Sequence, residues 1–88
     1  MAGNSSIYVT ITDGTVLQGD GGASTGAIVL QHKQADEYTD VILCDASLNS
    51  PHDPYVVWTY NHERGTCSKG EYFNNLDYAK SAYEEREF

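Results

Sequence analysis

The chain has 88 residues, of which 13 are acidic and five are basic, giving a formal charge of −8 at neutral pH. A chain of this length makes one domain, here expected over residues 1–88, with a thin core. The charge argues against direct binding to nucleic acid or anionic membrane and favours basic protein surfaces as partners, although acidity can also serve solubility alone.

The N-terminal third predicts a β-hairpin. We expect a disordered start over residues 1–6. These residues lack the basic and apolar regions of a signal peptide, so we also expect a cytoplasmic protein. Residues 7–12 alternate in polarity and are rich in β-branched side chains, which is typical of a strand. Asp13 and Gly14 tolerate positive φ, and a second short strand over residues 15–18 would complete the hairpin.

The middle of the chain predicts a loop, two strands and a second loop. Residues 19–26 read GDGGASTG, which indicates a flexible glycine-rich loop. It lacks the Gly-Lys-Ser/Thr ending of a phosphate-binding loop. Residues 27–32 and 40–44 predict strands, and the second is apolar on both faces and therefore central. Two prolines place residues 45–54 in a loop.

The last third predicts two strands and a helix. Residues 55–60 and 66–73 read as strands joined by a turn over residues 61–65, with a bulge at Gly70. Asn74 or Asn75 is expected to cap a helix over residues 75–86. We therefore predict an α+β fold, with a mainly antiparallel sheet of about five to six short strands and one C-terminal helix packed on a face. The apolar face of that helix comprises Leu76, Ala79, Ala82 and Tyr83.

Acidic side chains crowd the end of this helix, where the helix dipole disfavours them. They are Glu84, Glu85 and Glu87, and Lys80 and Arg86 offset them only partly. The crowding indicates either a binding surface or a solvated tail.

Metal binding and disulfide formation find little support in the residue spacing. The candidate ligands do not form the close pairs of a zinc site, so no metal or other cofactor is predicted. Cys44 reads as a small core residue. A Cys44–Cys67 disulfide would form only in an oxidising compartment. The candidate ligands are His32, His52, His62, Cys44 and Cys67.

Catalysis and nucleic-acid stacking are the other chemistries considered. Cys67 and His62 could form a thiol–imidazole pair, but no orienting carboxylate or oxyanion hole accompanies them, so we expect no enzyme. The aromatic residues Tyr55, Trp58 and Tyr60 could stack on bases. The few scattered cations would not neutralise the phosphates.

The run YVVWTYNHERGTCSKGEYFNNLDYAKSAYEER, residues 55–86, resembles the C-terminal part of small proteins of unknown activity from bacteria and their phages. The shared features are an aromatic strand, an Asn-x-Glu-x-Gly turn, a Gly-x-Tyr-Phe strand end and a short acidic helix. In size and acidity the chain is also similar in type to anti-CRISPR and other anti-defence inhibitors of phages. That resemblance implies an inhibitor acting in the host bacterial cytoplasm.

The expected function is therefore inhibition of a host nuclease complex, with a CRISPR effector suspected, by an acidic surface that mimics nucleic acid in a basic groove. An oligomeric sponge for a nucleotide messenger is one alternative. A plain interaction module, with a possible homodimer through the sheet edge or the Trp58 face, is another. The candidate partner-binding residues are Asp36, Glu37, Tyr38, Asp40, Glu84, Glu85 and Glu87.

Overall fold

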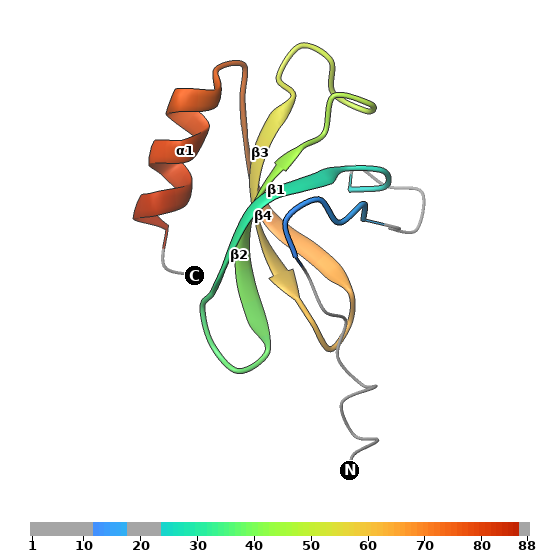
Figure 1. The fold of residues 1–88 in the computed structure, drawn as a ribbon, viewed down its shortest axis with the longest axis vertical. Coiled ribbons are helices and arrows are strands. Elements are labelled where there is room, and N and C mark those ends of the chain that lie inside the picture. The colour runs from blue at the N-terminus through green and yellow to red at the C-terminus, as the bar shows by residue number, and fades with distance from the viewer. Residues whose placement is uncertain (1–11, 18–23, 87–88) are drawn as a thin grey trace.

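The computed structural model describes residues 12–17 and 24–86. Within these ranges, four strands and a helix follow in chain order: β1 (Ile28–Gln34), β2 (Thr39–Asp45), β3 (Tyr55–Asn61), β4 (Thr66–Phe73) and α1 (Leu76–Glu85). The strands form one sheet of order β1-β2-β3-β4, and every neighbouring pair is antiparallel (Figure 1). The predicted α+β class, the antiparallel sheet, the C-terminal helix and the central position of β2 are confirmed.

The number of strands is smaller than predicted, four in place of five to six over the described residues. The expected second strand, residues 15–18, contributes only an isolated bridge between Val16 and Ile28. The segment runs beside the start of β1 for a few residues only, which is too short for a ladder. The expected strand over residues 7–12 lies outside the described residues apart from Thr12. The expected disordered start, residues 1–6, and most of the glycine-rich loop lie outside them too.

The Asp13-Gly14 turn is present. The amide of Thr15 donates to the carbonyl of Thr12 at 3.0 Å, and Gly14 has a φ of +90°. The following segment pairs with the start of β1, since Val29 N–H donates to Thr15 O at 2.8 Å. Its predicted partner, residues 7–12, lies outside the described residues apart from Thr12. Tertiary pairing with β1 therefore orders residues 14–17.

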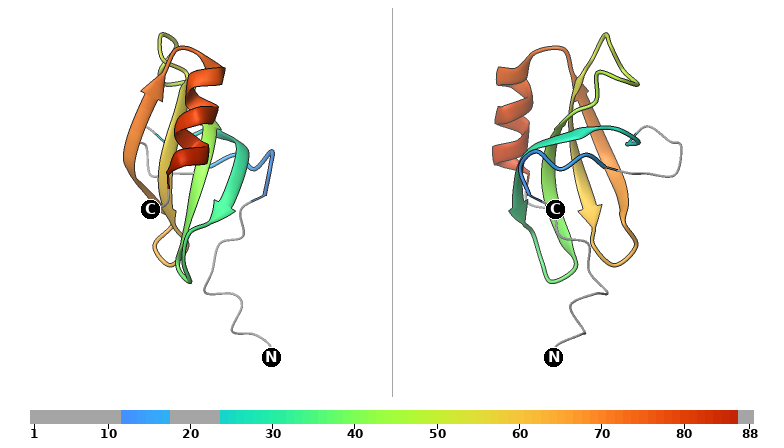
Figure 2. Two further views of the ribbon diagram at one scale, coloured as in Figure 1. Left: turned by 90° about the vertical axis from the view of Figure 1, so that its left-hand side faces the viewer. Right: turned by 45° about the vertical axis from the view of Figure 1, so that its right-hand side comes forward.

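The sheet has two buried faces with different covers. Side chains of β2 and β3 alternate between them, so both central strands are buried along nearly their whole length. One face, here called the helix face, comprises Val41, Leu43 and Val57 beneath Ala79 and Tyr83 of α1. The other, the loop face, is covered by residues 12–17 and neighbouring loops (Figures 1 and 2). Its buried cluster is Leu17, Ala27, Val29, Ile42, Cys44, Ala46, Val56, Trp58 and Tyr60.

The predicted bulge at Gly70 is confirmed. Val57 lies opposite Glu71 and Thr59 opposite Ser68, so β4 holds one extra residue against Trp58. A Cβ atom at position 70 would lie 2.6 Å from Nε1 of Trp58. Glycine therefore lets the indole approach the backbone of β4, and Lys69 takes a φ of +55° beside it.

Helix α1 begins as its sequence predicts. The side chain of Asn75 accepts from the amides of Asp77 at 2.8 Å and Tyr78 at 3.3 Å, which satisfies two free N–H groups of the first turn. Ala79 and Tyr83 are buried, and Leu76 and Ala82 are half-buried against the same cluster. The four residues expected on the apolar face are thus the ones that hold the helix to the sheet.

Within the described ranges, no helix has the length and hydropathy needed to cross a membrane.

Candidate functional site

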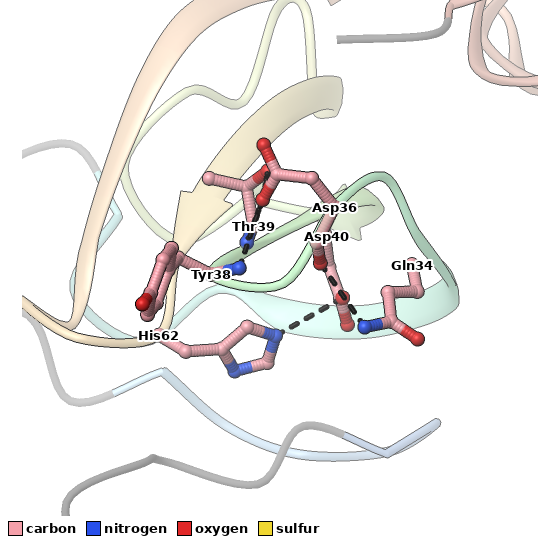
Figure 3. A network of polar contacts seen from close by, with 6 residues as sticks. All are labelled: Gln34, Asp36, Tyr38, Thr39, Asp40 and His62. Atoms are coloured by element: carbon pink, nitrogen blue, oxygen red, sulfur yellow. Dashed lines mark hydrogen bonds and ion pairs between the residues drawn. The ribbon is translucent and has the colours of Figure 1, made fainter.

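The β1–β2 turn carries three of the candidate residues and is organised by one of them. Oδ1 of Asp36 accepts from the amides of Tyr38 at 2.8 Å and Thr39 at 2.9 Å, and from the hydroxyl of Thr39 at 2.8 Å (Figure 3). The pKa of Asp36 is lowered, first by the Thr39 hydroxyl and then by the Tyr38 amide. Its carboxylate therefore shapes a turn that exposes Glu37 and Tyr38.

Asp40 differs from the other candidate acids because it is buried, with 6% of its surface exposed. Its place in β2 directs the side chain to the loop face with Ile42 and Cys44. A buried carboxylate requires a partner, and Nε2 of His62 lies 3.0 Å from Oδ1 of Asp40 (Figure 3). The expectation that Asp40 is an exposed partner contact is thus wrong.

His62 is enclosed although it adjoins a turn. Its side chain is only 16% exposed, and its ring lies edge-on to Tyr60 with 5.4 Å between the centroids. Its amide also donates to the carbonyl of Tyr38 at 2.8 Å. His62 therefore contacts the β1–β2 turn through its main chain and β2 through its side chain. The signal in the sequence was the alternation Trp58, Tyr60, His62, but the partner depends on the β2–β3 register.

The negative charge at the C-terminal end of α1 is compensated more fully than its sequence indicated. Nζ of Lys33, on β1, donates to the carbonyl of Glu84 at 3.1 Å. It also lies 4.9 Å from the ring centroid of Tyr83. Arg86 forms an ion pair with Glu71 of β4. A cation from a distant strand thus meets the negative end of the helix dipole, while the side chains of Glu84 and Glu85 stay exposed. Glu87 lies outside the described residues.

Three separate segments bring exposed acids toward one end of the molecule, here called the acidic end. The β1–β2 and β3–β4 turns lie side by side, since His62 N–H reaches Tyr38 O, and the last turn of α1 points toward them (Figures 1 and 2). Arg64 shares the β3–β4 turn. The exposed residue Tyr38, at 41%, adds an aromatic ring to this end. The acidic end comprises Asp36, Glu37, Glu63, Glu84 and Glu85.

The two thiols are free, and neither is activated. Cys44 on β2 and Cys67 on β4 are separated by β3, which places their Cα atoms about 10 Å apart or more, beyond the ~7 Å that a disulfide spans. Burial raises the pKa of Cys67 to about 11, against a smaller lowering by a hydrogen bond to Ser24. Burial, with smaller effects of Cys67 and Asp45, raises the pKa of Cys44. A catalytic thiol needs the opposite shift.

The aromatic residues considered for base stacking are part of the core. Trp58 and Tyr60 are each only 4% exposed, and Tyr55 is half-buried. Trp58 is therefore not available as a self-contact face either. Within residues 12–17 and 24–86, no three His, Cys, Asp or Glu side chains are placed to hold a metal ion.

Comparison with known proteins adds no assignment to this geometry. No family model matches the chain, and neither the curated proteins nor the solved structures searched include a significant match.

Proposed function

We propose that this chain is a non-catalytic binding protein whose acidic end occupies the basic nucleic-acid groove of a partner protein. The partner class proposed is a host defence nuclease complex, a CRISPR effector being the leading candidate. The observation that supports the proposal is that five exposed acids from three segments gather at one end, beside the exposed ring of Tyr38.

The physical role of these acids is to steer and orient the partner. A single exposed ion pair contributes little, about 0–1 kcal/mol. A set of carboxylates facing a basic groove speeds association and disfavours the wrong partners. Tyr38 supplies the apolar contact that charge alone lacks, because tyrosine is enriched at the centres of interfaces. The revised contact set omits Asp40, which is buried, and adds Glu63; Glu87 remains a predicted contact.

The fixed shape of the β1–β2 turn also supports this assignment. Asp36 anchors the turn through three hydrogen bonds, so Glu37 and Tyr38 are presented with little conformational freedom left to lose on binding. Preorganisation of this kind improves affinity by lowering the entropic cost of association.

Of the two alternative functions, pairing of two copies through the β4 edge of the sheet is opposed by a described feature. β4 is an edge strand, but it contains a bulge at Lys69 and Gly70. Bulges and lysines on an edge strand are devices that prevent edge-to-edge association. Among the described residues, we find no feature that favours a nucleotide sponge.

The test is an affinity capture from bacterial lysate that contains defence nucleases, washed at low and at high salt. We expect a nuclease subunit to be retained at low salt and lost at high salt, because exposed charges are screened by salt. Capture that survives both washes would point to an apolar interface. Capture of no nuclease subunit at either salt concentration would reject the proposal.

Charge reversal then locates the surface. Glu37→Lys and Glu85→Lys, alone and together, are expected to weaken capture of that nuclease progressively. Asp53→Lys, on the β2–β3 loop away from the acidic end, is the matched control with the same charge change. Equal weakening by Asp53→Lys would show that net charge, and no particular surface, governs the binding.

A further inference from the structure

Among residues 12–17 and 24–86 there are two aspartate–histidine pairs that differ in burial. Asp13 and His32 meet at 2.9 Å with side chains 66% and 34% exposed. Asp40 and His62 meet at 3.0 Å with side chains only 8% and 16% exposed. Removing one partner of a buried pair leaves an uncompensated charge or dipole, whereas exposed pairs contribute little. The Asp40–His62 pair is therefore the one that can affect the fold.

The buried pair lies at the end of the β2–β3 ladder, next to its last register pair, Thr39 and Asn61, where the β1–β2 and β3–β4 turns begin. His62 follows the last residue of β3, and Asp40 is the second residue of β2. The carbonyl of Tyr38 accepts from the amide of His62 at 2.8 Å, and the carboxylate of Asp40 meets its ring at 3.0 Å. His62 thus contacts the neighbouring residues Tyr38 and Asp40 at two points, only one of which depends on the ring; Figure 3 shows the ring contact with Asp40.

We propose that the Asp40–His62 pair is a pH-sensitive latch that holds the β1–β2 turn most firmly when His62 carries its second proton. Histidine is the side chain that ordinarily exchanges a proton between pH 5 and 8. With that proton the contact is an ion pair, and without it the contact is a weaker hydrogen bond from a neutral ring. The latch does not depend on the proposed binding function.

Among the described residues, the charged groups nearest His62 are mostly acidic. From β2 it faces Asp40, and from β3 the neutral ring of Tyr60. Gln34 of β1 lies opposite Asp40, and Cys67 of β4 lies opposite Tyr60, and both are neutral. The adjoining turns add three acids and one cation. These are Asp36, Glu37, Glu63 and Arg64.

The direction of the effect follows from this pairing. The stabilisation is fully present while the ring is charged, below the ordinary pKa of about 6.5 for a histidine. It is lost as rising pH removes the proton from His62. A group whose charged form is stabilised by folding in this way makes the protein more stable on the acidic side of its titration.

The test compares melting temperatures of the wild type, His62→Gln and His32→Gln between pH 5.5 and 7.5. Glutamine keeps an N–H donor but cannot be charged. We expect the wild type to exceed His62→Gln by roughly 4–8 °C at pH 5.5, and the difference to shrink by pH 7.5. His32→Gln, the matched control at the exposed pair, should track the wild type at both values. A difference between wild type and His62→Gln that does not change with pH overturns the proposal.

A second measurement on the wild type guards against poor folding of the variant. Nuclear magnetic resonance can follow the ring protons of His62 and the amides of Tyr38 and Thr39 through the same titration. We expect these amides to shift with the midpoint of His62. Amides that follow His32, or that do not shift, overturn the latch.

Discussion

The two faces of the sheet are formed mainly by the same two central strands but are covered by different kinds of structure. The helix face lies under a regular helix with a satisfied N-cap. The loop face lies under short segments, which local hydrogen bonds hold to the sheet and to one another, such as Gly26 N–H to Leu17 O and Asn49 Nδ2 to Thr25 O. The helix face therefore depends on one cooperative element, and the loop face on large side chains that fill space under irregular backbone.

The largest effect is expected at Trp58, on the loop face. Trp58→Ala would remove the largest buried side chain and leave a cavity that irregular backbone fills only partly. We expect a loss of about 3–5 kcal/mol in the free energy of unfolding, measured by urea denaturation. The exposed aromatic Tyr78→Ala, on the outer side of α1, is the control and should change stability by less than about 0.5 kcal/mol. A loss below about 1 kcal/mol at Trp58 would mean that the loop face is not a packed core.

A smaller effect on the same face is expected from Gly70→Ala. Its new Cβ atom would lie 2.6 Å from Nε1 and 2.9 Å from Cδ1 of Trp58, so the indole or the β4 bulge must shift. Overpacking of this kind costs about 1–3 kcal/mol. Ser68→Ala, at an exposed position of β4, is the control for the strand itself.

The contact between position 70 and Trp58 can be tested with a double variant. Combining Gly70→Ala with Trp58→Phe should recover part of the loss, because a smaller ring leaves room for the methyl group, and the two changes are then non-additive. Strictly additive losses in urea denaturation would contradict the proposed contact.

The helix face should respond to its cap. Asn75→Ala removes the acceptor for the amides of Asp77 and Tyr78, and we expect a loss of about 1 kcal/mol. Asn74→Ala, one residue earlier, lacks this capping role and is the control. The expected order in urea denaturation is wild type equal to Asn74→Ala and above Asn75→Ala; equal losses at both positions would contradict the assignment of the cap.

The smallest effect concerns the thiol beside the loop face at alkaline pH. The pKa of Cys67 rises from its ordinary value of 9.0 to about 11 on folding. The unfolded chain therefore releases this proton first, and stability should fall as pH rises from 9 to about 11. Cys67→Ala should lose less melting temperature over that window than the wild type. Burial, and to a smaller extent Cys67, raises the pKa values of Tyr60 and Tyr72. Removing the thiol therefore also reduces their contribution to the alkaline loss, in the same direction. Tyr83, whose raised pKa does not depend on Cys67, acts alike in both proteins.

Much of the fold was predictable because its signals are local. Two apolar runs predicted the central strands, Asn75 and the spacing of Leu76, Ala79 and Tyr83 predicted the helix, and Gly70 predicted the bulge. The expected second strand is reduced to one bridge between Val16 and Ile28. Residues 15–17 bond mainly to the start of β1 and to the residues just before it. A polarity pattern does not report how far two segments run together.

The candidate site was predictable only in part. The exposed acids of the β1–β2 turn and the helix end could be identified as acidic residues of a turn and a terminus. The burial of Asp40 could not be predicted, because its partner His62 lies 22 residues away in the sequence. The two residues meet only through the register of β2 and β3. The contact of Lys33 with the carbonyl of Glu84 could not be predicted either, because these residues are far apart in the sequence and meet only when α1 packs on the sheet.

The sequence by itself determined the two central strands, the helix and its cap, the bulge and the excess of negative charge, since each depends on neighbouring residues or on composition. Only the tertiary structure decided which acids are exposed, which one is buried against a histidine, and that two turns and a helix end lie at one end of the molecule. Those outcomes depend on contacts between residues far apart in the chain, whose positions are set when the antiparallel register and the packing of α1 form together.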